Sequence, residues 1–187
     1  MLMPGYDVAK AAQVVAFFAL KSGGKINVLK VAKLLYLSER EFMRLYDTPM
    51  FYDRLVSMPD GPVTSITLNL INGEFQNPVW GRFVSPREGL DVSSKCGMSF
   101  EQLEDLSVAD REILESLWEK FGPYDRFALR DWTHDKANIP EWEDPQGSAY
   151  LIEHKAVFHN LKKSDGKALE KEIENYRDMV RELSRPV

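Results

Sequence analysis

Three histidines are the residues of this sequence best able to bind a metal ion or move a proton: His134, His154 and His159. Histidines that share one metal usually stand three or four residues apart on a helix, so that both rings lie on one face. His154 and His159 are five residues apart, about 140° around a helix, and do not form such a pair. His134, which precedes Asp135, could join one of them only through the fold. A metal-dependent hydrolase that uses His134 and Asp135 is therefore the less favoured interpretation, and hydrogen bonding of the rings to loop backbone is favoured.

Nucleophilic and phosphate-binding chemistry has no recognisable pattern either. The single cysteine, Cys96, is not part of a Cys–His signature, and the chain has no GxxxxGKS/T, GxSxG or HExxH motif. A lone cysteine cannot form an internal disulfide, which indicates a reducing compartment. We therefore expect a protein without catalytic activity and without a cofactor.

The composition predicts an ordinary folded domain. The chain has 187 residues, 44% of them hydrophobic, and a net charge of -5. These values exclude a disordered chain and allow one hydrophobic core. The acidic balance disfavours nucleic acid as a partner. No apolar run approaches the roughly 20 residues that span a bilayer. The N-terminus has no basic region typical of a signal peptide, so we expect a cytoplasmic protein.

Helical periodicity and capping residues predict the elements that must position any site. Asp7 and Asn27 cap two early helices, which end near Ser22 and Pro49. Pro62 is expected to open a third helix, because proline fixes the backbone angle of a first helical turn. Further helices are expected at residues 107–121, 125–132, 149–161 and 167–183. An ordered loop is expected at 133–147.

Residues between these helices favour β-structure. A short strand is expected at 51–58, and a small hairpin of 79–85 with 90–93. The predicted fold is thus mainly α: a compact helical domain with a small β-hairpin in the middle, about residues 51–93, and a long C-terminal helix.

The last helix carries an apolar seam. Its members are spaced 4, 3, 4 and 3 residues apart, and they are Leu169, Ile173, Tyr176, Val180 and Leu183. Two heptads are too short for a stable isolated coiled coil, so the seam must pack on the domain, on a partner or on a second copy. We expect a domain at residues 1–160 and a helical extension at 161–187.

Several short motifs occur together in a fixed order. They are Lys33-Leu34-Leu35-Tyr36-Leu37, Gly61-Pro62-Val63, Phe121-Gly122, the segment from Asp125 to Leu129, Trp132-Thr133-His134 and Pro140-Glu141-Trp142. Their order and rough spacing resemble those of the SocA-like antitoxin domain, also called the Panacea domain, over about residues 8–155. Residues 77–97 match no motif of this family, which makes them a candidate segment for selecting a partner.

The resemblance implies an antitoxin of a two-gene, often phage-related, toxin–antitoxin system. Such a domain neutralises its toxin by direct protein–protein binding, and the alternative is an adaptor that delivers the toxin to an ATP-dependent protease. An acidic antitoxin would suit a basic toxin.

The motif residues have two interpretations. The favoured one is structural: Gly61 allows close backbone approach, Pro62 fixes a helix start, and Trp132 and Trp142 bracket His134 around a backbone hydrogen bond. In the other, Trp132, His134 and Trp142 contact the toxin, since aromatic residues are enriched at interfaces. The seam of the last helix is the second candidate contact.

Overall fold

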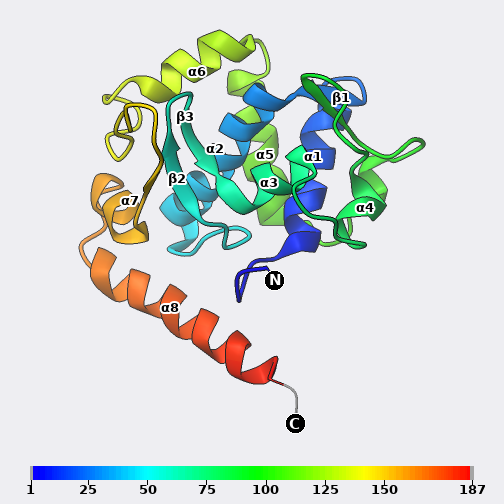
Figure 1. Ribbon diagram of the computed structural model, residues 1–187. Helices are drawn as coiled ribbons and strands as arrows, with labels where there is room; N and C mark the ends of the chain where they lie inside the picture. Colours follow the sequence, from blue (N-terminus) through cyan, green and yellow to red (C-terminus); the bar gives the residue numbers. More distant parts are fainter. Residues whose placement is uncertain (1, 186–187) are drawn as a thin grey trace.

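The computed structural model describes residues 2–185 and is mainly helical, with a small β region in the middle and a long C-terminal helix (Figure 1). The two helices that bury the most residues are α1 (Val8–Lys21) and α2 (Val28–Tyr46). The other helices are α3 (Ser65–Asn72), α4 (Trp80–Phe83), α5 (Val108–Phe121), α6 (Arg126–His134), α7 (His154–Asn160) and α8 (Gly166–Leu183), with a 3-10 turn at Phe100–Gln102. The expected fold class is confirmed. No helix within residues 2–185 is long and apolar enough to cross a membrane.

The helix starts follow the capping residues that the sequence offers. The Asp7 carboxylate accepts a hydrogen bond from the Lys10 N–H, and the Asn27 side chain accepts one from Leu29. Each bond satisfies a backbone donor that has no partner inside its own helix. Residues 11–19 of α1 are all buried, because α2, α3, α4 and α5 pack around them.

A tight hairpin joins β2 (Leu55–Met58) to β3 (Gly61–Thr64), and β5 (Tyr150–Leu151) pairs with the other side of β2. All pairs are antiparallel, and Met58 lies opposite Gly61. The expectation that Pro62 opens a helix is wrong. Pro62 lies in an edge strand, where its missing N–H breaks no ladder, and α3 begins after Thr64.

Two further expectations about the middle and late segments need correction. Residues 80–83 form the short helix α4, because Trp80 and Phe83 are three residues apart and bury together against α1. The strand β4 (Asp91–Ser93) pairs with β1 (Lys25–Asn27), so no hairpin joins 79–85 to 90–93 beyond one bridge between Val84 and Ser94. The helix expected from residue 149 begins only at His154, since residues 150–151 are used as β5.

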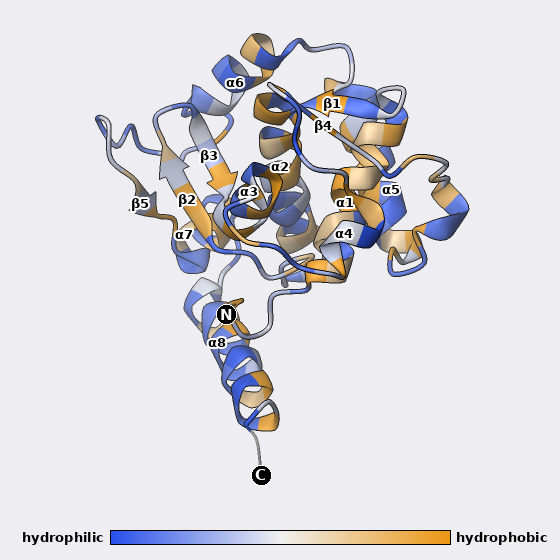
Figure 2. Ribbon diagram, turned by 45° about the vertical axis from the view of Figure 1, so that its right-hand side comes forward, coloured by the Kyte–Doolittle hydropathy of each residue, from blue (hydrophilic) through white to orange (hydrophobic). Residues whose placement is uncertain are grey.

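The seam of α8 is divided between two environments. Leu169 and Ile173 are buried and join the common core, mainly through α7. Beyond them α8 leads away from the body of the molecule, with hydrophobic residues recurring to its C-terminal end (Figure 2). Tyr176 stacks on Tyr52 with ring centroids 4.5 Å apart, whereas Leu183 is 79% exposed.

A buried acidic pair, Glu39 and Asp53, organises the chain around the hairpin. Glu39 accepts backbone N–H bonds from Met50, Phe51 and Asp53. Asp53 accepts the N–H groups of Ile66 and Thr67 and so caps α3 from outside that helix. Burial raises the pKa of Glu39 to about 8 and also raises that of Asp53, although these hydrogen bonds oppose the shift.

Arg177 on α8 supplies a compensating positive charge to this pair. Its guanidinium donates to the carbonyl oxygens of Tyr52 and Asp53, both at 3.3 Å. Burial lowers the pKa of Arg177, and the charges of Glu39 and Asp53 oppose that shift. The first turns of α8 are therefore fixed to the domain by packing and by charge.

Replacing Asp53 with alanine should reduce the free energy of unfolding by at least about 3 kcal/mol, because buried donors of Arg54, Ile66 and Thr67 lose their acceptor. The matched control is Asp125→Ala, which removes an exposed cap that accepts from Phe127 and Ala128. That change should cost only about 1 kcal/mol. Urea unfolding measures both values, and equal losses would contradict the role assigned to Asp53.

Candidate functional site

The motif residues, far apart in the sequence, meet at the turn between β2 and β3. Lys33 on α2 is fully buried, and its Nζ donates a hydrogen bond to the Pro62 carbonyl at 3.0 Å. Leu34 and Val63 pack into the core beside this contact. The helix and the turn are thereby joined through an ammonium group that burial would otherwise destabilise.

Gly61 is the residue at which the turn most closely approaches α2 and α6. Its φ angle is +99°, a conformation that side chains with a Cβ rarely adopt. A Cβ atom at this position would lie 3.0 Å from His134 Cδ2, Lys33 Nζ and Thr133 Oγ1. The absence of a side chain therefore lets α2, α6 and the turn approach one another.

The C-terminal end of α6 and the loop that follows it pack against the β2–β3 turn. His134 stacks on Trp142 with a centroid distance of 4.3 Å and an interplanar angle of 2°. Trp142 Nε1 donates to the Met58 carbonyl, and the backbone of Asp60 hydrogen-bonds to His134. Burial lowers the pKa of His134, and the charge of Lys33 lowers it further. Trp132 does not bracket His134 as expected, but packs on Phe121 with ring centroids 4.8 Å apart.

A second buried polar cluster is centred on Glu141 and includes Tyr36, the tyrosine of the first motif. The Tyr36 hydroxyl donates to Glu141 Oε1 at 2.8 Å, and Arg40 Nε approaches the same oxygen at 2.6 Å. Asn160 on α7 donates to Glu141 Oε2. The Glu141 carboxylate therefore joins α2, the loop after α6 and α7.

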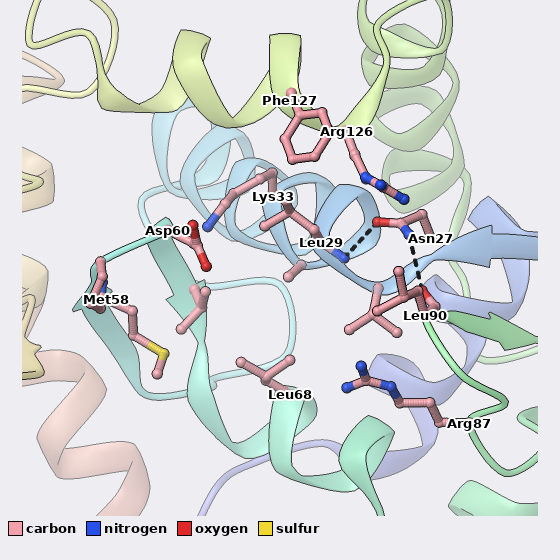
Figure 3. Close-up of a pocket in the computed structure, with 14 residues that line it drawn as sticks. Asn27, Leu29, Lys33, Met58, Asp60, Leu68, Arg87, Leu90, Arg126 and Phe127 are labelled. Carbon is pink, nitrogen blue, oxygen red and sulfur yellow. Dashed lines mark hydrogen bonds between the residues drawn. The ribbon is translucent and has the colours of Figure 1, made fainter. Parts of the chain in front are cut away.

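A pocket of about 440 Å³ opens directly beside the Lys33 contact (Figure 3). Its lining comes from the start of α2, the β2–β3 turn, α3, the segment before β4, and the start of α6. Larger pockets of about 500 and 630 Å³ lie beside α4 and between α7 and α8, away from this contact. We therefore take the pocket beside Lys33, called here the turn pocket, as the candidate functional site.

The turn pocket combines an apolar lining with several charges. Val28, Leu29 and Leu68 contribute apolar surface, and Leu90 and Phe127 are 58% and 47% exposed. Burial lowers the pKa of Lys33 to about 7, which the Asp60 carboxylate partly offsets and the Arg130 guanidinium reinforces. Such a surface can bind an apolar group together with a charged one.

The predicted partner contacts lie in different environments. Trp132 and His134 are half-buried, whereas Trp142 is buried at 7% exposure. In α8, Leu169 and Ile173 pack in the core of the protein. Tyr176, Val180 and Leu183 remain at least partly accessible to a partner.

Sequence reasoning did not single out Arg87, Leu90, Arg126 and Phe127 as contact residues. Arg126 and Phe127 lie in the motif segment 125–129, and Arg87 and Leu90 lie in the candidate segment 77–97, but only the fold brings the four together in one pocket.

The histidines do not come together. Among residues 2–185, no group of three His, Cys, Asp or Glu side chains is placed to hold a metal ion. His154 is buried beside Arg177, and burial lowers its pKa to about 4. Cys96 is exposed.

Comparison with known families agrees with this arrangement. Residues 31–143 match the family described as antitoxin SocA-like, Panacea domain. The chain belongs to this family. The match includes Lys33, the Gly61-Pro62 turn, His134 and Trp142, so the residues that meet at the turn all lie in the family region. No curated protein and no solved structure matches the chain.

Replacing Gly61 with alanine should destabilise the protein through both backbone strain and contact with α2 and α6. Gly24→Ala is the matched control, because Gly24 has a φ of +104° with open space around the added Cβ. We expect the control to lose about 1–2 kcal/mol of unfolding free energy. Gly61→Ala should lose about 1–3 kcal/mol more. Denaturant unfolding compares the two, and equal losses would show that the close approach is unimportant.

The lowered pKa of Lys33 predicts a pH dependence of stability. The unfolded chain keeps the lysine proton up to its ordinary pKa of 10.5, whereas the folded chain releases it near 7. Stability should therefore rise with pH between these values, by at most about 1.4 kcal/mol per pH unit.

Lys33→Met should lack this rise between about pH 7 and 9, below the range around 10.0 in which Tyr6 and Tyr36 titrate in the unfolded chain. Glu39 titrates in both proteins, so the difference between their stability curves isolates Lys33. Lys25→Met, at a side chain that is 70% exposed, controls for the loss of a positive charge. Parallel curves for Lys33→Met and the unsubstituted protein would contradict the assignment.

Proposed function

We propose that this protein is the antitoxin of a two-gene toxin–antitoxin system and neutralises its toxin by binding it directly. The observation that carries the proposal is the family match over residues 31–143, which contains the full set of contacts around Gly61. Membership of an antitoxin family points to a role without catalysis. The contacts around Gly61 are those of a rigid scaffold, and a rigid scaffold binds a partner with little loss of conformational freedom.

Two exposed apolar surfaces support a binding function. One is the rim of the turn pocket, with Leu90 and Phe127. The other is the outer half of α8, where Met179 is 53% and Leu183 is 79% exposed. Exposed apolar residues that gather at one place are typical of sites that contact another protein.

The charge of the chain favours a basic toxin. A net charge of -5 attracts a cationic protein over distances of about 10 Å at ordinary salt concentrations. This attraction mainly increases the rate of association. We therefore expect the rate of complex formation to fall as salt concentration increases.

Co-expression with the adjacent gene tests the proposed function. The product of that gene should arrest growth when expressed alone, and this protein should restore growth and co-purify with it in a fixed ratio. Gly61→Ala, produced at a temperature where it remains partly folded, should restore growth less well than Gly24→Ala. A harmless neighbouring product, or toxicity that persists with this protein present, would contradict the proposal.

Delivery of the toxin to an ATP-dependent protease is the second candidate function, and the outer half of α8 is the feature in its favour. An adaptor needs a second contact surface apart from the one that holds its cargo, and Met179 and Leu183 lie on a helix that leads away from the domain (Figure 2). Under this function Leu183→Glu should lengthen the toxin's half-life in cells while leaving toxin binding unchanged. If the toxin's half-life is the same with Leu183→Glu as with the unsubstituted protein, neutralisation by binding alone is favoured.

A further inference from the structure

Two arginines line one end of the turn pocket without a carboxylate partner in the described part of the chain. Arg126 lies over the ring of Phe127, 4.7 Å from its centroid. Arg87 donates to the Gly89 carbonyl and to the Asn72 side chain. Neither guanidinium is among the ion pairs formed within residues 2–185. The charged residues that line the pocket are therefore three cations, Lys33, Arg87 and Arg126, and one anion, Asp60, on a chain whose net charge is -5. The Asp125 carboxylate also acts on Arg126, but it lies outside the lining.

The two arginines and the Asp60 carboxylate lie at opposite ends of the turn pocket. Arg87 and Arg126 lie at the end that contains Asn27 and Leu90, whereas Asp60 lies at the opposite end near Met58 (Figure 3). Lys33 is on the Asp60 side, and the Asp60 carboxylate acts on its charge. The arginine end can accept an anion, and the Asp60 end repels one.

Apolar side chains form the wall between the two ends. Leu29 and Leu68 lie between the two ends, with Leu68 on the α3 side (Figure 3). Val28 and Val63 also line the pocket. A volume of about 440 Å³ is enough for a large side chain of a partner together with a neighbouring acidic group. Burial of the apolar side chain supplies the affinity, and the arginines fix its orientation.

We propose that the turn pocket binds an acidic segment of the toxin, with one large apolar side chain seated against Leu68 and an adjoining carboxylate paired with Arg87 and Arg126. This inference rests on the proposed function and adds the chemistry of the contact. A toxin that is basic overall fits the acidic remainder of the chain, and a local acidic segment fits this pocket. Arg87 and Leu90 belong to residues 77–97, the segment expected to select the partner.

The test measures the affinity of the purified protein for the product of the adjacent gene. Arg126→Glu should weaken binding by about tenfold or more, since it places a carboxylate against the toxin's own. The matched control is Arg44→Glu, which makes the same change of charge at an exposed arginine on α2. Arg44 is 49% exposed and lies outside both the turn pocket and residues 77–97. This control should bind within about twofold of the unsubstituted protein, because rim charges far from a contact contribute little.

A charge exchange identifies the toxin segment. Each Asp or Glu that adjoins a large apolar residue in the toxin is changed to Lys, and one of these variants should recover part of the affinity for Arg126→Glu. Circular dichroism and thermal melting confirm that Arg126→Glu is folded. Arg87→Glu provides an independent second substitution at the same end of the pocket.

The outcomes separate this inference from the proposed function. If the unsubstituted protein does not bind the neighbouring product, both are overturned. If it binds and Arg126→Glu and Arg87→Glu bind equally well, or if no charge exchange restores affinity, only the inference is overturned. If light scattering shows that Arg126→Glu dissociates a dimer of the free protein, the pocket accepts a second copy and the inference is also overturned.

Discussion

The hydrogen bond from the buried Lys33 ammonium to the Pro62 carbonyl is the constraint on which the surrounding structure depends. A lysine removed from water is destabilising unless its donors find partners, and its lowered pKa reports that cost. The turn must therefore bring a carbonyl to α2, which in turn requires a residue without a Cβ at Gly61. His134 and Trp142 then close over the turn from α6 and its following loop. Three separate regions of sequence are thereby held at one place.

Local signals in the sequence predicted the helices well where a cap and a periodic apolar face coincide. The caps at Asp7 and Asn27 are confirmed, and the helices expected from residues 107 and 125 begin there, directly after the capping side chains of Ser107 and Asp125. Pro62 was misassigned because proline suits both a first helical turn and an edge strand, and pairing with β2 decides between them. No local pattern could make that choice.

The candidate site was predictable only in part. The motifs named Lys33, Gly61 and His134, and these residues do meet. The positive charges at one end of the turn pocket come from Arg87 and Arg126, which are far apart in the sequence, and no local pattern indicates that they meet. Their proximity depends on how β4 pairs with β1 and how α6 crosses the turn, which are long-range contacts. The scaffold of the site is thus visible in the sequence, whereas its binding chemistry becomes visible only in the fold.

We expect the partner to bind the surface over the Lys33 contact rather than the seam of α8. Hydrogen–deuterium exchange of this protein, alone and with the product of the adjacent gene, distinguishes the two surfaces. On binding, exchange should slow at residues 58–61, 87–91 and 124–128, the segments that surround the turn pocket. Protection confined to residues 176–183 of α8, with the pocket segments exchanging as in the free protein, would contradict this expectation.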